Sequence, residues 1–198
     1  MVNYDRSTVL VVVDVQNDFA DSKGSLYVGE GERIVPPVNR EIERALAAEA
    51  VVAYTQDWHP AQTPHFQSGG GVWPEHCVQY TWGAQLHPDL RVAGEVVRKG
   101  QGGEDGYSGF TVRDPVTGQE AATPLEGLLR RRGIGRVVVV GLATDYCVKE
   151  TALDAVRLGF DTVVLGELVG AVDLQPGDGE RALAAIRAAG ARVEQQPA

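Results

Sequence analysis

The chain has 198 residues, of which 43% are hydrophobic, and this length predicts one domain over residues 1–198 with a full core. Its formal net charge of −9 disfavours nucleic acid and anionic membrane surfaces as partners. Its apolar runs fall far short of the roughly 20 residues that cross a bilayer. The first residues show no secretory pattern, so the sequence predicts a cytoplasmic protein whose two cysteines are free thiols.

Short runs of β-branched residues alternate with helical patterns along the chain. The predicted strands cover residues 8–13, 51–54, 95–98, 136–140, 161–165 and 191–193. The predicted helices cover residues 33–48, 124–132, 146–158 and 179–189, and Gly133 and Gly159 are expected to cap two of them. Near-continuous apolar strands are typical of a parallel sheet that helices cover on both faces. The predicted fold class is α/β, a three-layer α/β/α domain with a mainly parallel sheet of about six strands.

Two segments interrupt this alternation. Residues 60–88 are rich in proline, glycine, histidine and tryptophan, and residues 100–110 are rich in glycine. Long irregular segments inside a compact domain are usually functional. The glycine-rich segment is not followed by the Gly-Lys-Ser/Thr of a phosphate-binding loop, so we expect no such loop there. Residues 195–198 are expected to fray.

Reactive side chains follow four of the predicted strands. Asp14 follows the first strand, Asp57 and His59 the second, Lys99 the third and Cys147 the fourth. Ligands of parallel α/β sheets bind outside the carboxyl ends of the strands, near the point where strand order reverses. If the first and fourth strands are neighbours, Asp14 and Cys147 face each other across that point.

Cys147 is the candidate nucleophile. Residues 141–147 read as a strand end, a tight turn, an N-cap at Thr144 or Asp145, and the first turn of a helix. A thiol at a helix start is expected to have a lowered pKa. Backbone N–H groups of Ala143 and Cys147 are the candidate oxyanion-hole donors. The alternative is a small buried apolar residue, which is the common fate of a free cysteine.

Asp14 and Lys99 are the candidate partners of this thiol. Asp14 ends an apolar strand, where its carboxylate could take the thiol proton and pass it to a leaving group. A turn-forming or capping role is the alternative, and Asp18 suits that role better. Lys99 would hold the carboxylate and the thiolate in their charged forms. A solvated lysine at a strand end is the alternative.

A metal site is predicted beside the second strand. Its candidate ligands are Asp57, His59, His65 and His76, and three of the four histidines of the chain lie within 18 residues there. Three imidazoles and a carboxylate suit Zn²⁺ or Fe²⁺ and suit Mn²⁺ or Mg²⁺ less well. His87 is interpreted as a loop residue.

Aromatic side chains in the irregular segments are candidates for a substrate pocket. Phe19, Trp73 and Tyr107 would line it together with Leu142, and loop-to-core packing is the alternative. Cys77 is interpreted as a packing residue.

Five motifs together resemble a known family. They are residues 13–19 (VDVQNDF), 57–60 (DWHP) with His65, 73–77 (WPEHC), 99–100 (KG) followed by 107–110 (YSGF), and 141–148 (GLATDYCV). The set resembles the nicotinamidases of the isochorismatase-like cysteine hydrolase superfamily. The resemblance extends from Val11 to about Gly190, nearly the whole chain.

The resemblance implies a role for each of the candidate residues. The implied catalytic triad is Asp14, Lys99 and Cys147. The implied metal ligands are Asp57, His59 and His76, with His65 as a fourth ligand in some members. A cis peptide bond between Leu142 and Ala143 is implied at the oxyanion hole.

The activity that the resemblance implies is the hydrolysis of nicotinamide to nicotinate and ammonia, in NAD salvage. The reaction would pass through a cysteine thioester, with one divalent ion, Zn²⁺ or Fe²⁺ with Mn²⁺ as an alternative, orienting the pyridine ring. Pyrazinamide is a further expected substrate.

Two departures from the family pattern, at residues 101–106 and at Trp82, lie near the expected pocket mouth. Two other readings remain open: a metal-free relative acting on another small amide, a carbamoyl compound or a vinyl ether such as isochorismate, and a non-catalytic zinc-binding scaffold.

Overall fold

The computed structural model describes residues 2–195. Its main sheet has six strands in the order β3-β2-β1-β6-β7-β8, and every neighbouring pair is parallel. The strands are β1 Thr8–Val13, β2 Val51–Asp57, β3 Glu95–Lys99, β6 Arg136–Leu142, β7 Asp161–Gly170 and β8 Arg192–Glu194. The α/β class and the parallel six-stranded sheet are therefore confirmed. Of the residues expected to fray, 196–198 lie outside the described part of the chain.

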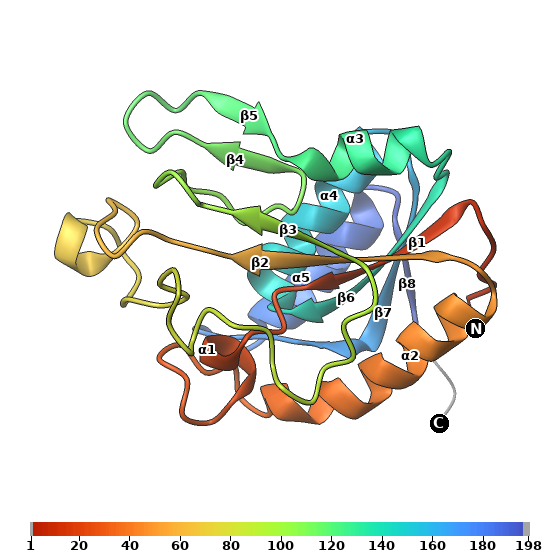
Figure 1. The fold of residues 1–198 in the computed structure, drawn as a ribbon, viewed down its shortest axis with the longest axis horizontal. Coiled ribbons are helices and arrows are strands. Elements are labelled where there is room, and N and C mark those ends of the chain that lie inside the picture. Colours follow the sequence, from red (N-terminus) through yellow and green to blue (C-terminus); the bar gives the residue numbers. More distant parts are fainter. Residues whose placement is uncertain (1, 196–198) are drawn as a thin grey trace.

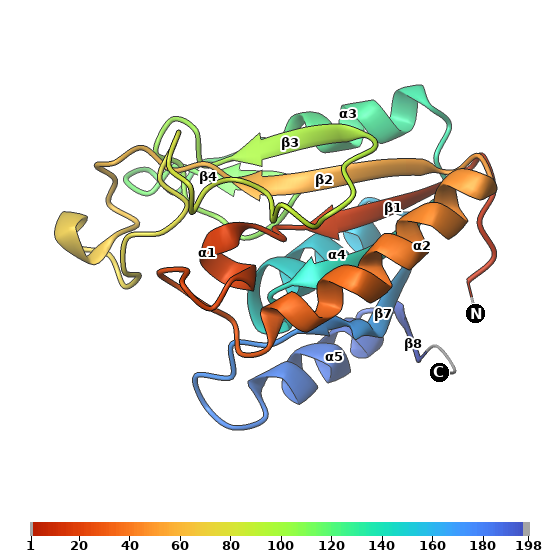
Figure 2. The same ribbon diagram turned by 60° about the horizontal axis from the view of Figure 1, so that its bottom comes forward.

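Helices cover both faces of the sheet, which makes three layers (Figures 1 and 2). One face packs on α1 (Asn17–Ala20) and α2 (Val35–Ala47). The other face packs on α3 (Pro124–Arg131), α4 (Lys149–Arg157) and α5 (Asp178–Ala188). Because side chains alternate along a strand, β1 sends successive valines and its leucine to opposite cores, and all six of its residues are buried. This double burial explains the continuous apolar runs in the sequence.

Two helices end where the sequence predicts, and two begin differently. Gly133 and Gly159 have φ angles of 66° and 82° just after α3 and α4, as predicted for C-terminal caps. The first long helix begins later than predicted, because a 3-10 turn at Gly31–Ile34 precedes α2. The helix predicted at residues 146–158 begins as a π-helix at Thr144–Val148 and continues as α4.

A small second sheet was not predicted. Strands β4 (Thr111–Arg113) and β5 (Glu120–Ala122) form an antiparallel hairpin beside β3, seen near the top of Figure 1. Both strands have only three residues, those of β5 exposed and those of β4 half-buried or exposed, so they carry no hydrophobic pattern that sequence analysis can detect.

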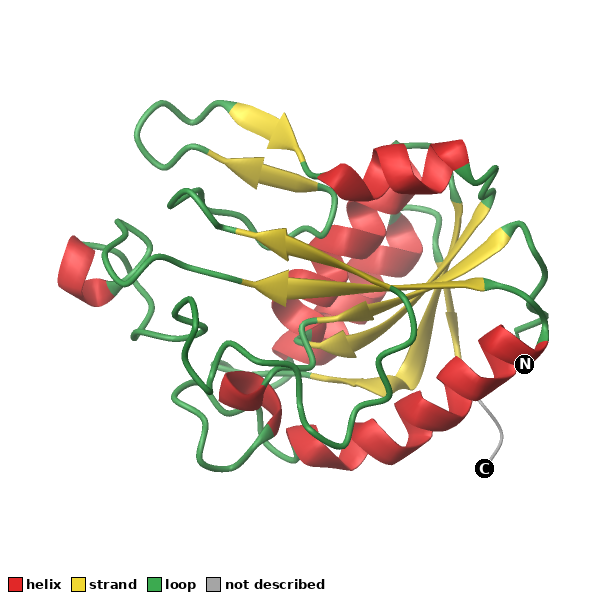
Figure 3. Ribbon diagram, in the orientation of Figure 1, coloured by secondary structure: helices red, strands yellow, loops and turns green. Residues whose placement is uncertain are grey.

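The topology brings the irregular segments to one edge of the sheet. The chain adds strands in one direction from β1 to β3 and in the other from β6 to β8, so strand order reverses between β1 and β6. These two strands are neighbours, as the prediction for Asp14 and Cys147 required. The long loops gather beyond the carboxyl ends of the strands (Figure 3), and a short 3-10 helix, Gln67–Gly69, lies among them. Within residues 2–195, no helix has the length and apolar character that a bilayer crossing requires.

Candidate active site

Asp14 lies directly after β1 and is completely buried. Its backbone is in the left-handed region, with a φ of 47°, a conformation that non-glycine residues adopt mainly where the surrounding structure enforces it. Thr55 on β2 supplies that enforcement: its carbonyl and its hydroxyl accept the Asp14 N–H at 3.3 and 3.2 Å. The Thr55 hydroxyl also donates to Oδ1 of Asp14 at 2.7 Å, so it fixes the direction of the carboxylate.

Lys99 connects the candidate base, a candidate metal ligand and the candidate nucleophile. It ends β3 opposite Asp57, the last residue of β2, and its side chain is 1% exposed. Its Nζ atom lies 3.0 Å from Oδ2 of Asp14, contacts Oδ1 of Asp57 and lies 3.6 Å from Sγ of Cys147. Burial by itself lowers the pKa of Lys99, but the two carboxylates outweigh burial and hold this pKa well above its usual value. The lysine therefore remains a cation.

The thiol of Cys147 faces these groups. The ligand-type atoms of Asp14, Asp57 and Cys147 all lie within 4.8 Å of one another. Burial raises the pKa of Cys147 well above its usual value; Lys99 opposes this rise, and Asp14 and Asp57 add to it. The lowered pKa predicted from the helix start is therefore wrong, because burial penalises the thiolate. Burial also raises the pKa of Asp14, against the opposing effects of Lys99 and Thr55.

The turn that carries Cys147 differs from the predicted one. The π-helix has Ala143 as its N-cap, with no side-chain cap, so the predicted capping by Thr144 or Asp145 is wrong. The Asp145 carboxylate instead accepts the backbone N–H groups of Val172 and Asp173, at 3.0 and 2.9 Å, and ties this turn to the segment after β7. The peptide bond before Ala143 is cis, as the family resemblance implied.

Three predicted metal ligands form a cluster. Ligand nitrogens of His59, His65 and His76 lie within 4.8 Å of one another, and all three side chains are buried. Nδ1 of His65 donates to Asp105 at 2.7 Å and Nδ1 of His76 donates to the Pro74 carbonyl at 2.8 Å, which leaves each Nε2 free to bind an ion. Both ring nitrogens of His59 are buried without a hydrogen-bond partner within the described structure. A buried imidazole without partners is costly, and a metal ion would satisfy it.

Burial favours the neutral, metal-binding form of these imidazoles. It lowers the pKa of His59 to about 4 and also lowers the pKa of His76. The donor set therefore fits a divalent cation.

Asp57 lies between the histidine cluster and the lysine. Its Oδ1 is 3.8 Å from Nε2 of His59 and also contacts Lys99. Burial alone raises the pKa of Asp57, yet Lys99 first, and then His59 and His76, hold it at about 2. Gln16 fixes the backbone here: its Oε1 accepts the Asp57 N–H at 2.8 Å and its Nε2 donates to the Asp57 carbonyl at 2.7 Å. Sequence reasoning missed Gln16 and Thr55, although Gln16 stands two residues after Asp14.

A cavity opens beside the thiol. Its lining comprises Phe19, Leu26, Val28, Asp57, His65, Trp73, His76, Gly106, Tyr107, Ala143, Tyr146, Cys147 and Val172. The indole N–H of Trp73 donates to the Tyr107 hydroxyl at 2.9 Å, and both rings pack edge-on against Tyr146. Leu142 does not line the cavity as predicted, because its side chain points into the core and is fully buried.

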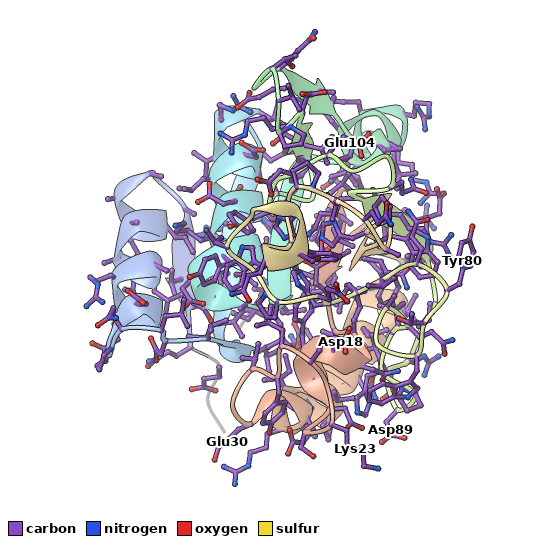
Figure 4. All side chains as sticks on the ribbon, turned by 90° about the vertical axis from the view of Figure 1, so that its left-hand side faces the viewer. Asp18, Lys23, Glu30, Tyr80, Asp89 and Glu104 are labelled. Atoms are coloured by element: carbon purple, nitrogen blue, oxygen red, sulfur yellow. The ribbon has the colours of Figure 1, made fainter. Side chains whose placement is uncertain are left out.

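Three other residues have the structural roles expected of them. Asp18 accepts the backbone N–H groups of Ser25 and Cys77, at 3.0 and 2.7 Å, in the loops that Figure 4 shows from the carboxyl edge of the sheet. Cys77 is fully buried in the core. His87 accepts the Asp89 N–H at 3.3 Å and lies outside the histidine cluster.

Comparisons with known proteins agree with this geometry. The isochorismatase domain model matches residues 8–196. A nicotinamidase of Escherichia coli is 40% identical, over 93% of this chain and 92% of its own. The structure of a pyrazinamidase of Pyrococcus horikoshii in complex with zinc has a TM-score of 0.85 at 38% identity and covers 96% of this chain and 99% of its own. The structure of PnC1 from L. infantum in complex with nicotinate has a TM-score of 0.86 at 36% identity and covers 98% and 96%. The chain therefore belongs to the isochorismatase domain family.

Proposed function

We propose that the protein is a nicotinamidase, an amide hydrolase that converts nicotinamide to nicotinate and ammonia. The observation that carries the proposal is the cavity, which is lined by the Cys147 thiol, by histidines of the cluster and by aromatic side chains. A flat ring with a nitrogen at one side and a carboxamide at the other suits such a cavity. The E. coli relative is a nicotinamidase and the L. infantum structure holds nicotinate, which supports this substrate class.

We assign one divalent metal ion to His59, His65, His76 and Asp57. The imidazole-rich donor set favours Zn²⁺ or Fe²⁺ over Mn²⁺, and the P. horikoshii structure contains zinc. When bound, the ion supplies a Lewis acid that attracts and orients the ring nitrogen of the substrate. All further steps belong to the protein side chains.

In the first step, Asp14 takes the proton of the Cys147 thiol as the sulfur bonds to the carboxamide carbon. The thiol has a raised pKa, so this proton must leave during the attack. Lys99 contacts both partners and stabilises the negative charge as it moves from carboxylate to sulfur. The backbone N–H groups of Ala143 and Cys147 are the proposed donors to the oxyanion.

In the second step, Asp14 returns the proton to the amide nitrogen, the carbon–nitrogen bond breaks and ammonia leaves a thioester on Cys147. A water molecule then attacks the thioester carbonyl while Asp14 accepts one of its protons. The carbon–sulfur bond breaks, the thiol regains a proton and nicotinate is released. The same carboxylate thus serves as base and acid in turn, a role that suits its raised pKa.

The experiment is ammonia release from nicotinamide, pyrazinamide and an aliphatic amide, before and after removal of metal by a chelator. We expect both ring amides to be hydrolysed, the aliphatic amide to be a poor substrate, and chelation to abolish turnover until metal is restored. Equal turnover of the aliphatic amide, unaffected by chelation, would identify a metal-free amidase instead. Absence of turnover together with a thiol inert to iodoacetamide would indicate a zinc-binding scaffold.

A further inference from the structure

We propose that Asp105 is a positioning residue for the metal site, holding the His65 ring so that its Nε2 atom is presented to the ion. The inference deepens the proposed function and rests on it, since the histidine cluster is the same.

The three histidines of the cluster differ in what holds Nδ1. The Nδ1 of His76 has a neutral carbonyl as its partner, and that of His59 has no partner within the described structure. The Nδ1 of His65 alone among the three donates to a carboxylate, at 2.7 Å. A carboxylate on the distal nitrogen fixes the tautomer and the ring plane of a metal-binding imidazole and strengthens it as a donor.

Asp105 is itself held independently of His65. Its backbone forms a two-way antiparallel bridge with Arg113 of β4, with N···O distances of 2.7 and 2.6 Å. Its Oδ1 also accepts the Gly106 N–H at 2.8 Å, and the Arg113 guanidinium lies 3.7 Å from Oδ2. The unpredicted β4–β5 hairpin therefore provides the fixed base from which the carboxylate reaches the histidine.

His65 needs such an anchor because it lies in an irregular segment. His59 lies two residues beyond the end of β2, whereas His65 lies eight residues beyond it. Thr63 gives a second link between the two loops: its hydroxyl accepts the His65 N–H at 3.3 Å and donates to the Gly103 carbonyl at 3.4 Å. The glycine-rich loop thus contacts the histidine loop at two points: Gly103 accepts a hydrogen bond from Thr63, and Asp105 accepts one from the His65 ring.

The test compares zinc affinity, measured by competition with a chromogenic chelator, in the wild type and in Asp105→Asn protein. Asparagine keeps the size of the side chain but removes the charge, so we expect binding to weaken by about 10- to 100-fold. Glu104→Gln is the matched control. Glu104 lies on the same loop, is labelled in Figure 4, and its carboxylate accepts the Gly102 N–H at 2.8 Å. Its affinity should stay within about twofold of the wild type.

A double-mutant cycle separates positioning of His65 from a general effect on the loop. In a His65→Ala background, Asp105→Asn should cause no further loss of zinc affinity. A further loss as large as in the wild type would overturn the proposal. Nitrogen-15 NMR of the zinc-loaded wild type, which needs no variant to fold, must place the His65 proton on Nδ1; a proton on Nε2 would also overturn it.

These measurements use zinc without substrate, so the two proposals can fail separately. If the wild type releases no ammonia but Asp105→Asn weakens zinc binding, the proposed function is wrong and the role of Asp105 stands. If the wild type hydrolyses nicotinamide but Asp105→Asn protein binds zinc normally, only the proposed role of Asp105 is wrong.

Discussion

The Lys99 ammonium lies 3.6 Å from the Cys147 sulfur, although the two residues are 48 positions apart; Lys99 ends β3, whereas Cys147 lies in the π-helix after β6. The same ammonium contacts Asp14 and Asp57, so one buried cation compensates two buried carboxylates beside a thiol. Because Lys99 contacts all three groups, we expect its substitution to affect both turnover and stability.

Lys99→Met should abolish turnover and destabilise the fold, because it leaves two buried carboxylates without their cation. Breaking a buried ion pair from one side typically costs about 3 to 5 kcal/mol. Urea denaturation of the metal-free protein at neutral pH measures the loss. Lys149→Met is the control, since Lys149 is partly exposed and its ammonium lies 3.1 Å from the Glu150 carboxylate. It should change stability by less than about 1 kcal/mol, and an equal loss in both variants would contradict the account.

Asp57→Ala should lose bound metal, because it removes the carboxylate next to the histidine cluster. Elemental analysis of the purified protein measures this directly. Glu75→Gln provides a matched control, since this exposed residue precedes His76 and accepts a hydrogen bond from Ser68. The control should retain metal. Unchanged metal content in Asp57→Ala protein would remove Asp57 from the ligand set.

Thr55→Val tests the assignment of Asp14 as the base. The Thr55 hydroxyl stabilises the charged carboxylate and so lowers the pKa of Asp14 against the larger effect of burial. Removing it should raise that pKa further. Because the base acts in its ionised form, the acidic side of the kcat/KM profile should move to higher pH. Stability should fall by about 1 to 3 kcal/mol, the cost of a buried group left without its partner.

Thr162→Val is the control for this profile. Thr162 is also buried, but it lies near the start of β7 and its hydroxyl donates to the Phe160 carbonyl at 3.1 Å. Its pH profile should match the wild type. An unshifted profile in Thr55→Val protein would mean that Asp14 does not set the acidic limb.

The raised pKa of Cys147 predicts slow alkylation at neutral pH. Burial first, then Asp14 and Asp57, raise this pKa, and Lys99 opposes them. The iodoacetamide rate of metal-free Cys77→Ala protein, in which Cys147 is the remaining thiol, should still be rising above pH 8.5, where an ordinary thiol is half ionised. In the metal-loaded protein, nicotinate should suppress labelling. A rate that levels off below pH 7 would restore the lowered pKa predicted from the sequence.

The sequence was sufficient to predict the main sheet, because β1 and β6 are buried on both faces and their continuous apolar runs are typical of a parallel sheet. It also predicted that Asp14, Asp57 and Lys99 would meet at one edge of the sheet, because all three stand at strand ends. It failed for the β4–β5 hairpin, whose short exposed strands have no periodicity.

The supporting contacts were beyond sequence reasoning. Thr55 and Gln16 act through hydrogen bonds between segments about 40 residues apart, and nothing local marks them. The orientation of Leu142 and the desolvation of Cys147 depend on how the core closes around the turn after β6. Local pattern predicts where a side chain is placed along an element; its solvation and its partners depend on the packing of several elements.

Acid quenching during turnover, followed by mass analysis of the peptides, tests the central claim most directly. With nicotinamide as substrate, the account predicts a nicotinoyl group on the peptide that contains Cys147, and none on the peptide that contains Cys77. Cys147→Ala protein should carry no such group, should turn over at least about 10⁴-fold more slowly, and should still bind nicotinate. Undiminished ammonia release by Cys147→Ala protein would contradict the assignment of Cys147 as the nucleophile.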